Sequence, residues 1–274
     1  MNVRQRIGAL EQHMTERDIA ILGDLEQFRL LTTRHLQRLH FPAAPLGPHI
    51  TVSGATRGTT RVLTRLEGHG VITRLTRRIG GIKHGSAITI WQLGAAGDRL
   101  LRARRGDPIR RRYDECGLTF ATHMLAVAEI GVTLKERSHA AQFELLELAT
   151  EPSCWRAFSG TGTSVLTLKP DLYVVTADAT TETHSFIEVD QATEHLPAVL
   201  RKCHTYQRYE RSGTEQRQRG LFPAVVWIAP TQTRANQIRT AIIGDDNLDT
   251  ELFWVATTET MLRHLVPYAP TITT

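Results

Sequence analysis

Acidic residues alternate with apolar ones in the segment Phe186–Asp190, whose sequence is Phe-Ile-Glu-Val-Asp. Successive side chains of a β-strand point to opposite faces, so Glu188 and Asp190 are predicted to leave the same face of one strand. Asp171 follows a proline at the start of another β-rich segment, and it joins the pair if the two strands are neighbours. Three carboxylates together suit Mg²⁺ or Mn²⁺, which prefer oxygen ligands. The alternative is an edge strand whose solvent-facing acids only prevent association.

A lysine lies on an apolar helical face in the next segment of the chain. Val199, Lys202, Tyr206 and Tyr209 recur at helical spacing, which predicts that the ammonium group of Lys202 lies among apolar and aromatic side chains. An unpaired charge is costly there, and Lys202 therefore needs an anion. A carboxylate of the acidic group or a scissile phosphate would supply it. The alternative is that Lys202 lies at the margin of this face and reaches water through its flexible stem.

The elements that would position these residues alternate between helical and β-type patterns. A buried helical stripe begins at Phe120, and β-rich runs follow at residues 143–148, 166–176, 185–189 and 224–229. Helices fit residues 196–209 and 234–243, and residues 253–256 add a last strand. This order predicts a mixed sheet flanked by helices, which places the chain in the α/β (α+β) fold class.

Charge is divided unequally along the 274 residues, whose net charge is +5. Residues 1–112 hold 20 lysines and arginines against 8 acidic residues, whereas residues 113–274 hold 13 against 20. A basic module joined to an acidic one is typical of a polyanion-binding domain attached to a domain that bears carboxylates. The alternative is that the basic face is only solvated.

The basic module has the element order of a winged helix-turn-helix. Helical patterns at residues 15–25, 33–39 and 54–67 are followed by two β-rich runs at residues 71–79 and 87–93. A glycine-rich turn joins these two runs into a hairpin. In such a domain the third helix enters the major groove of double-stranded DNA.

Basic side chains mark the expected DNA-facing surface of this module. Arg57, Arg61 and Arg65 recur every four residues on the third helix, where arginine can bond guanine bidentately. On the hairpin, or wing, the residues that would reach phosphates are Arg74, Arg77, Arg78 and Lys83. Some winged helices bind proteins, which is the alternative to DNA.

Composition excludes several other classes of protein. No apolar run reaches the length of a membrane span, and the first residues are charged where a signal peptide needs an apolar run, so we expect a cytoplasmic protein without a membrane partner. Three widely spaced cysteines form neither a disulfide framework nor a zinc ribbon. The predicted domains are a winged helix at residues 1–101, a basic linker at 102–116 and a carboxylate-bearing domain at 117–274.

Several short motifs follow one another along almost the whole chain. They are Thr15–Ile19, Phe28–Thr32 with His35–Phe41, Thr122–Glu129, Lys169–Asp171, Ile187–Glu194, Lys202 with Tyr206, and Phe222–Trp227. In this order and spacing they resemble the replication-relaxation family, a group of plasmid, phage and integrative-element proteins of Gram-positive bacteria. The resemblance implies a winged helix followed by a mixed-sheet domain similar to the PD-(D/E)XK, or restriction-endonuclease-like, nucleases.

In those nucleases an acid after proline and an acid on the next strand hold the metal, and Asp171 and Glu188 match these two positions. The lysine expected two residues after the second acid is replaced here by Asp190. Either Lys202 takes its place from the helix, or the site has lost cleavage. A further acid sometimes comes from the first helix or the first strand of the domain, where the candidates are Glu129, Glu147 and Glu151.

If the site is active, the resemblance implies metal-assisted hydrolysis of a phosphodiester. Asp171 and Glu188 would hold Mg²⁺ or Mn²⁺. Asp190 would be a third ligand or orient the water, and Lys202 would stabilise the developing negative charge.

Two functions therefore compete. One is a sequence-directed endonuclease or nickase of a mobile element, and the other is a non-catalytic regulator or replication accessory with a degenerate nuclease fold. A scaffold in a relaxosome or transposition complex is compatible with both. Double-stranded DNA is the expected partner, together with replication or conjugation proteins, and a homodimer would suit palindromic sites.

Overall fold

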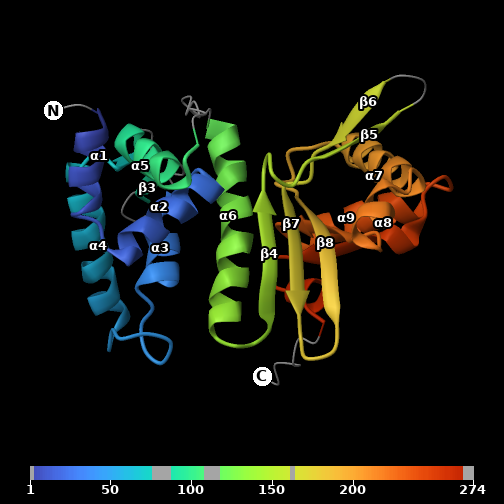
Figure 1. The fold of residues 1–274 in the computed structure, drawn as a ribbon. Coiled ribbons are helices and arrows are strands. Elements are labelled where there is room, and N and C mark those ends of the chain that lie inside the picture. Colours follow the sequence, from blue (N-terminus) through green and yellow to red (C-terminus); the bar gives the residue numbers. More distant parts are fainter. Residues whose placement is uncertain (1–2, 76–87, 108–117, 161–163, 268–274) are drawn as a thin grey trace. The chain divides into compact units, whose positions relative to one another are not determined.

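The structure, a computed structural model, describes residues 3–75, 88–107, 118–160 and 164–267 (Figure 1). The chain divides into two compact units, residues 1–136 and 137–274. Each unit contains its own cluster of buried apolar side chains. Among the described residues no helix is both long enough and apolar enough to cross a membrane.

The first unit combines helices with a small antiparallel sheet. Its strands pair in the order β1-β3-β2, and they are β1 (Leu31–Thr32), β2 (Ile72–Arg74) and β3 (Ile90–Leu93). Its helices are α1 (Val3–Glu11), α2 (Glu16–Phe28), α3 (Thr33–His40), α4 (Val52–Gly68), α5 (Ala95–Arg105) and α6 (Leu118–His139). The last turn of α6 passes the boundary of the unit.

Capping residues determine where these helices begin. Thr15 forms a capping box with Asp18 at the start of α2, and Thr32 forms another with His35 at the start of α3. The hydroxyl of Thr51 accepts a hydrogen bond from a backbone N–H in the first turn of α4. Apolar residues at helical spacing are then buried, among them Ile21, Leu22, Leu25, Leu36, Leu63 and Leu66.

The sequence-based expectations for this unit match most of its elements. The three helices and both strands of the hairpin lie at the predicted places, whereas α1 was not predicted. Helix α5 continues to Arg105, so the first residues of the expected linker are helical. Three residues of the expected wing, Arg77, Arg78 and Lys83, lie outside the described residues.

Helix α6 packs on the first unit. Glu129 of α6 accepts a hydrogen bond from Nη1 of Arg38 on α3 at 2.6 Å. Met124 of α6 joins a buried apolar cluster that includes Leu30 and Ile90. These contacts place most of the helix in the first unit, whereas the sequence pattern predicts a second domain that begins at residue 117.

The second unit is built on a five-stranded mixed sheet. Its strands lie in the order β10 (Phe253–Thr257), β9 (Ala224–Ala229), β8 (Glu182–Val189), β7 (Leu172–Ala177) and β4 (Glu144–Thr150). Strands β4, β7 and β8 are antiparallel, whereas β8, β9 and β10 are parallel. The predicted mixed α/β class is thereby confirmed. The other elements are β5 (Arg156–Ser159), β6 (Val165–Leu168), α7 (Leu196–Arg211), α8 (Thr214–Arg219), α9 (Gln232–Ile243), the 3₁₀ turn η1 (Thr250–Leu252) and α10 (Leu262–Leu265).

The run at residues 166–176, predicted as one strand, is divided between two sheets. Strand β6 ends at Leu168 and pairs with β5, and β7 begins at Leu172 in the five-stranded sheet. Pro170 lies between them and has no N–H to donate to a strand ladder. The break leaves Asp171 at the point where the chain enters the central sheet.

One face of the five-stranded sheet packs against α7 and α9. Phe186 of β8 and Trp227 of β9 share a buried cluster with Val199 and Tyr206 of α7 and Ile238 of α9. Figure 1 shows α7 and α9 close together beside β8. Because residues two apart on a strand share a face, Glu188 points to the same side as Phe186, toward α7.

Candidate functional site

Asp171 lies beside Glu188 because of the register between β7 and β8. Leu172 pairs with Ile187, and the backbone N–H of Asp171 donates to the carbonyl of Ile187 at 3.1 Å. Oδ2 of Asp171 accepts a hydrogen bond from the N–H of Val189 at 2.7 Å. The turn after Pro170 therefore fixes the first predicted acid opposite the second.

Glu188 is 1 % exposed and has hydrogen-bond partners on α7 for both carboxylate oxygens. Tyr206 donates to Oε1 at 2.7 Å, and the ammonium group of Lys202 donates to Oε2 at 3.1 Å. Burial, followed by the negative charge of Asp171, raises the pKa of Glu188 to about 7. The two acids thus interact electrostatically in a buried site.

Lys202 lies at the outer edge of this group. Its ammonium group is 3.1 Å from Glu188 and 3.6 Å from Glu194, and its side chain is 41 % exposed. Burial alone would lower the pKa of Lys202, but the charges of Glu188, Asp171 and Glu194 outweigh it and raise this pKa. The lysine is therefore a stable cation that can face both the buried acid and an incoming anion.

Asp190, predicted as a third ligand or as the residue that orients water, has a different partner from Glu188. Both of its carboxylate oxygens accept hydrogen bonds at 2.9 Å from the guanidinium of Arg234 on α9, and Oδ2 also accepts from the N–H of Ala192 at 2.9 Å. The side chain of Asp190 is fully buried. A buried carboxylate needs a cation, and Arg234 supplies it within the fold.

Sequence reasoning missed two partners in this region. The buried side of α9 carries Arg234, Ile238 and Ile242 at intervals of four. A charged residue on an apolar helical face, the pattern that identified Lys202, was therefore also present for Arg234. Tyr206 lies four residues after Lys202 on the same helical face, and its hydroxyl donates to the same acid, a bond that the spacing alone did not predict.

The three candidates for a further acid lie in different environments. Glu129 belongs to the first unit, where it pairs with His35 and Arg38. Glu147 on β4 pairs with Arg219 at 2.8 Å. The remaining candidate is Glu151, whose negative charge contributes to the raised pKa of Cys154. The thiol of Cys154 donates to the carbonyl of Pro170 at 3.0 Å. The residues described by the structure contain no ready group of three or more metal-binding side chains.

The described arginines of the expected DNA interface differ in whether they have partners within the unit. Arg57 and Arg61 are exposed on α4. Arg74 stacks over Trp91 and pairs with Glu67 at 2.8 Å.

Arg65, the third arginine predicted on the DNA-facing stripe of α4, pairs within the unit while its side chain stays 39 % exposed. Its Nη2 lies 2.6 and 2.7 Å from the two carboxylate oxygens of Asp18, which is buried at the start of α2. Because a buried carboxylate requires a cation, Arg65 connects α4 to α2 through this pair.

A sequence model of one protein family, described as Replication-relaxation, matches residues 22–225. The chain belongs to the replication-relaxation family. No curated protein matches it, and no solved structure does. The part of this replication-relaxation protein that matches the family extends from α2 into β9 and includes Asp171, Glu188 and Lys202, but it ends before Arg234. The family points to a role in the replication of plasmids or mobile elements.

Proposed function

We propose that this replication-relaxation protein binds double-stranded DNA of a plasmid or mobile element through its first unit and hydrolyses phosphodiesters with its second. The observation that carries the nuclease half is the meeting of Glu188 and Lys202 at 3.1 Å beside Asp171. Two acids and a lysine gathered near the end of the central strand of a mixed sheet are the functional groups that metal-assisted phosphodiester hydrolysis requires.

Two interacting carboxylates fit a small divalent cation. The charge of Asp171 contributes to the raised pKa of Glu188, and a cation between the two acids would remove this repulsion. Mg²⁺ is commonly held by one or two carboxylates, with water and substrate phosphate as its other ligands. Asp171 and Glu188 are therefore the proposed ligands of Mg²⁺ or Mn²⁺. When bound, such an ion would polarise the phosphate and lower the pKa of its water.

The chain's own residues have separate roles in this proposal. Lys202 offers its ammonium group to the negative charge that develops on the phosphate. Tyr206 orients Glu188 through the hydrogen bond to Oε1. The buried aromatic face around Glu188 excludes water, which strengthens each of these electrostatic contacts. Asp190 takes no part, because Arg234 occupies both of its oxygens.

The DNA-binding half rests on the first unit. Helices α2, α3 and α4 followed by the paired strands β2 and β3 have the order of a winged helix-turn-helix. Arg57 and Arg61 are exposed on α4, the helix that would enter the major groove. The excess of basic over acidic residues in residues 1–112 favours a polyanion as the ligand.

A cleavage assay tests the nuclease half. Supercoiled and linear DNA are incubated with Mg²⁺ or Mn²⁺ and either wild type or Asp171→Asn, and DNA binding is measured in parallel. We expect metal-dependent nicking or cutting by the wild type, and none above background by Asp171→Asn, because the variant loses the charge that holds the ion. DNA binding should be unchanged, since the variant leaves the basic residues proposed to hold DNA intact.

The matched control is Asp246→Asn, which neutralises an exposed acid of the same unit. This variant should cleave as the wild type does. Binding without cleavage by the wild type, across both metals and both DNA forms, would exclude the nuclease half.

A non-catalytic DNA-binding regulator is the second candidate function. One observation favours it. Asp190, which is held by Arg234, occupies the position where the PD-(D/E)XK nucleases carry their lysine. The same assay separates the two candidates, because a regulator binds DNA in every variant and cleaves it in none.

A further inference from the structure

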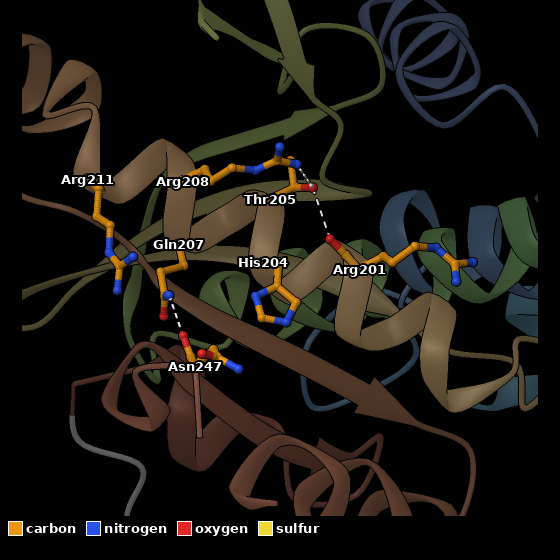
Figure 2. A pocket seen from close by; sticks show the side chains of 7 residues that line it. All are labelled: Arg201, His204, Thr205, Gln207, Arg208, Arg211 and Asn247. Carbon is orange, nitrogen blue, oxygen red and sulfur yellow. Dashed lines mark hydrogen bonds between the residues drawn. The ribbon is translucent and has the colours of Figure 1, made fainter. Parts of the chain in front are cut away.

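The outer side of α7 borders a groove in the second unit. The groove has a volume of about 570 Å³. Figure 2 shows that its lining comes from successive turns of α7 and from Asn247 in the segment after α9. The α7 residues that matter here are Arg201, His204, Thr205, Arg208 and Arg211.

The three arginines of this groove have different surroundings from three other arginines of the unit. Arg156, Arg219 and Arg234 each pair with a carboxylate. By contrast, Arg201, Arg208 and Arg211 are exposed, and within the described part of the chain no carboxylate lies within ion-pair distance of them. The sequence of this unit is acidic overall, so a general excess of basic residues does not explain why three arginines lie together here.

The immediate surroundings leave these charges uncompensated. Asp245 lies near the groove, but its side-chain partners are His204, at 2.8 Å, and Asn247, and among the described residues it forms no ion pair with the three arginines. Arg208 donates a hydrogen bond to the hydroxyl of Thr205 at 3.2 Å, which orients the guanidinium without neutralising it. One wall is fixed, because the side chain of Gln207 donates to the carbonyl of Asn247 at 2.7 Å and accepts from the N–H of Asp249 at 2.6 Å. A groove with one rigid wall and three arginines that lack an acidic partner among the described residues is suited to binding an anion.

The spacing of the arginines suits a chain of phosphates better than a single one. At a rise of about 1.5 Å per residue, Arg201 and Arg208 lie about 10 Å apart along α7, and Arg211 lies about 5 Å further. Successive phosphates of one DNA strand rise by about 3.4 Å along the duplex axis, so the row covers several of them. Arg201 also precedes Lys202, which connects the row to the candidate nuclease site on the neighbouring face of the helix.

We propose that this α7 groove binds the phosphate backbone of DNA and continues the path of the strand away from Asp171 and Glu188. The inference rests on the proposed function in that it takes DNA as the ligand, but it requires no cleavage. The contact is independent of base sequence, because guanidinium groups on phosphates do not identify bases.

The test measures binding of a fluorescently labelled, random-sequence duplex in the presence of EDTA over a range of salt concentrations. The variant is the triple substitution Arg201→Ala, Arg208→Ala and Arg211→Ala. Each lost phosphate contact should reduce the slope of log K against log salt by about 0.9, so we expect the triple variant to lose roughly two to three units of slope. Two controls accompany it: the triple lysine substitution at the same positions, which keeps the charge, and Arg217→Ala with Arg263→Ala, which removes exposed arginines elsewhere in the unit.

Both controls should keep the slope of the wild type, and circular dichroism should show that every variant is folded. A triple alanine variant with the affinity and slope of the wild type would overturn the α7 groove as a DNA contact. If the triple alanine variant loses slope in EDTA but the wild type cleaves no DNA with Mg²⁺ or Mn²⁺, the nuclease proposal fails and this inference stands. If the wild type binds no DNA at any salt concentration, both fail.

Discussion

Glu188 and Asp190 are two residues apart on β8, yet they meet different cations from different helices. Lys202 on α7 reaches Glu188 and remains partly exposed, whereas Arg234 on α9 pairs with an Asp190 side chain that is fully buried. An exposed edge leaves room for a ligand, and a closed bidentate pair does not. The first pair is therefore suited to chemistry and the second to holding α9 on the sheet.

The buried pair should make a large contribution to the free energy of unfolding. Replacing Arg234 with alanine leaves the charge of Asp190 buried and unpaired, which typically costs about 3–5 kcal/mol. We expect urea denaturation of Arg234→Ala, and likewise of Asp190→Ala, to show a loss of this order.

The double variant Asp190→Ala with Arg234→Ala is the control, because it leaves neither charge unpaired. It should be more stable than the sum of the two single losses predicts. An Asp190→Ala variant that unfolds like the wild type but has lost cleavage would instead place Asp190 in the active site.

The sequence predicted a residue's surroundings in the site where they follow from the period of the helix or strand that carries the residue. Lys202 on an apolar stripe needed an anion, and the period of a strand placed Glu188 toward a covered face. The partner of Asp190 depended on where α9 packs, which the local pattern of β8 does not contain. The same limit applies to Arg65, because the pairing with Asp18 forms only when α4 and α2 lie side by side.

At the scale of elements, the sequence specified most strands and helices through periodicity and capping. Strand β9 has the predicted bounds, and α2 and α3 begin within one residue of their predicted starts. The division of residues 166–176 between β6 and β7 was not predicted, although Pro170 within that run was a visible signal. The assignment of α6 to the first unit depends on long-range contacts, so a local pattern could not provide it.

The contact between α6 and α3 should make stability depend on pH. Burial opposes the ionisation of Glu129, but hydrogen bonds from His35 and Arg38 outweigh it and lower the pKa of Glu129 to about 2. A folded-state pKa below the ordinary value of 4.5 means that the ionised group stabilises the fold above about pH 4.5. This stabilisation is lost as the pH falls toward 2.

Accordingly, Glu129→Gln should be less stable than the wild type at neutral pH, and the difference should shrink as the pH falls from about 4.5 toward 2. Urea midpoints of both proteins at several pH values measure it. A difference that stays constant over this interval would show that the charge of Glu129 does not hold α6 to α3.

At the scale of the whole molecule, the two units carry opposite charge balances and different candidate roles. The basic side chains of the first unit suit a sequence-reading contact, and the acids of the second suit an ion. Replacing Arg57 and Arg61 with alanine should weaken the binding of the cognate duplex by roughly 1–3 kcal/mol for each arginine that contacts a base. Fluorescence anisotropy at constant salt measures this loss.

The matched control is Arg99→Ala, which removes an exposed arginine from α5. Its affinity should remain close to that of the wild type. Equal affinity of wild type, control and the Arg57/Arg61 double variant would mean that α4 does not face the DNA.

The central claim is that Asp171 and Glu188 share one divalent cation. Titration with Mn²⁺, followed by the loss of the electron paramagnetic resonance signal of the free ion, tests it without DNA and without cleavage. We predict that the wild type and Glu259→Gln, which changes an exposed acid of the same unit, take up a single ion at this site, and that Asp171→Asn and Glu188→Gln do not. No uptake by the wild type, or equal uptake by all four proteins, would contradict the account.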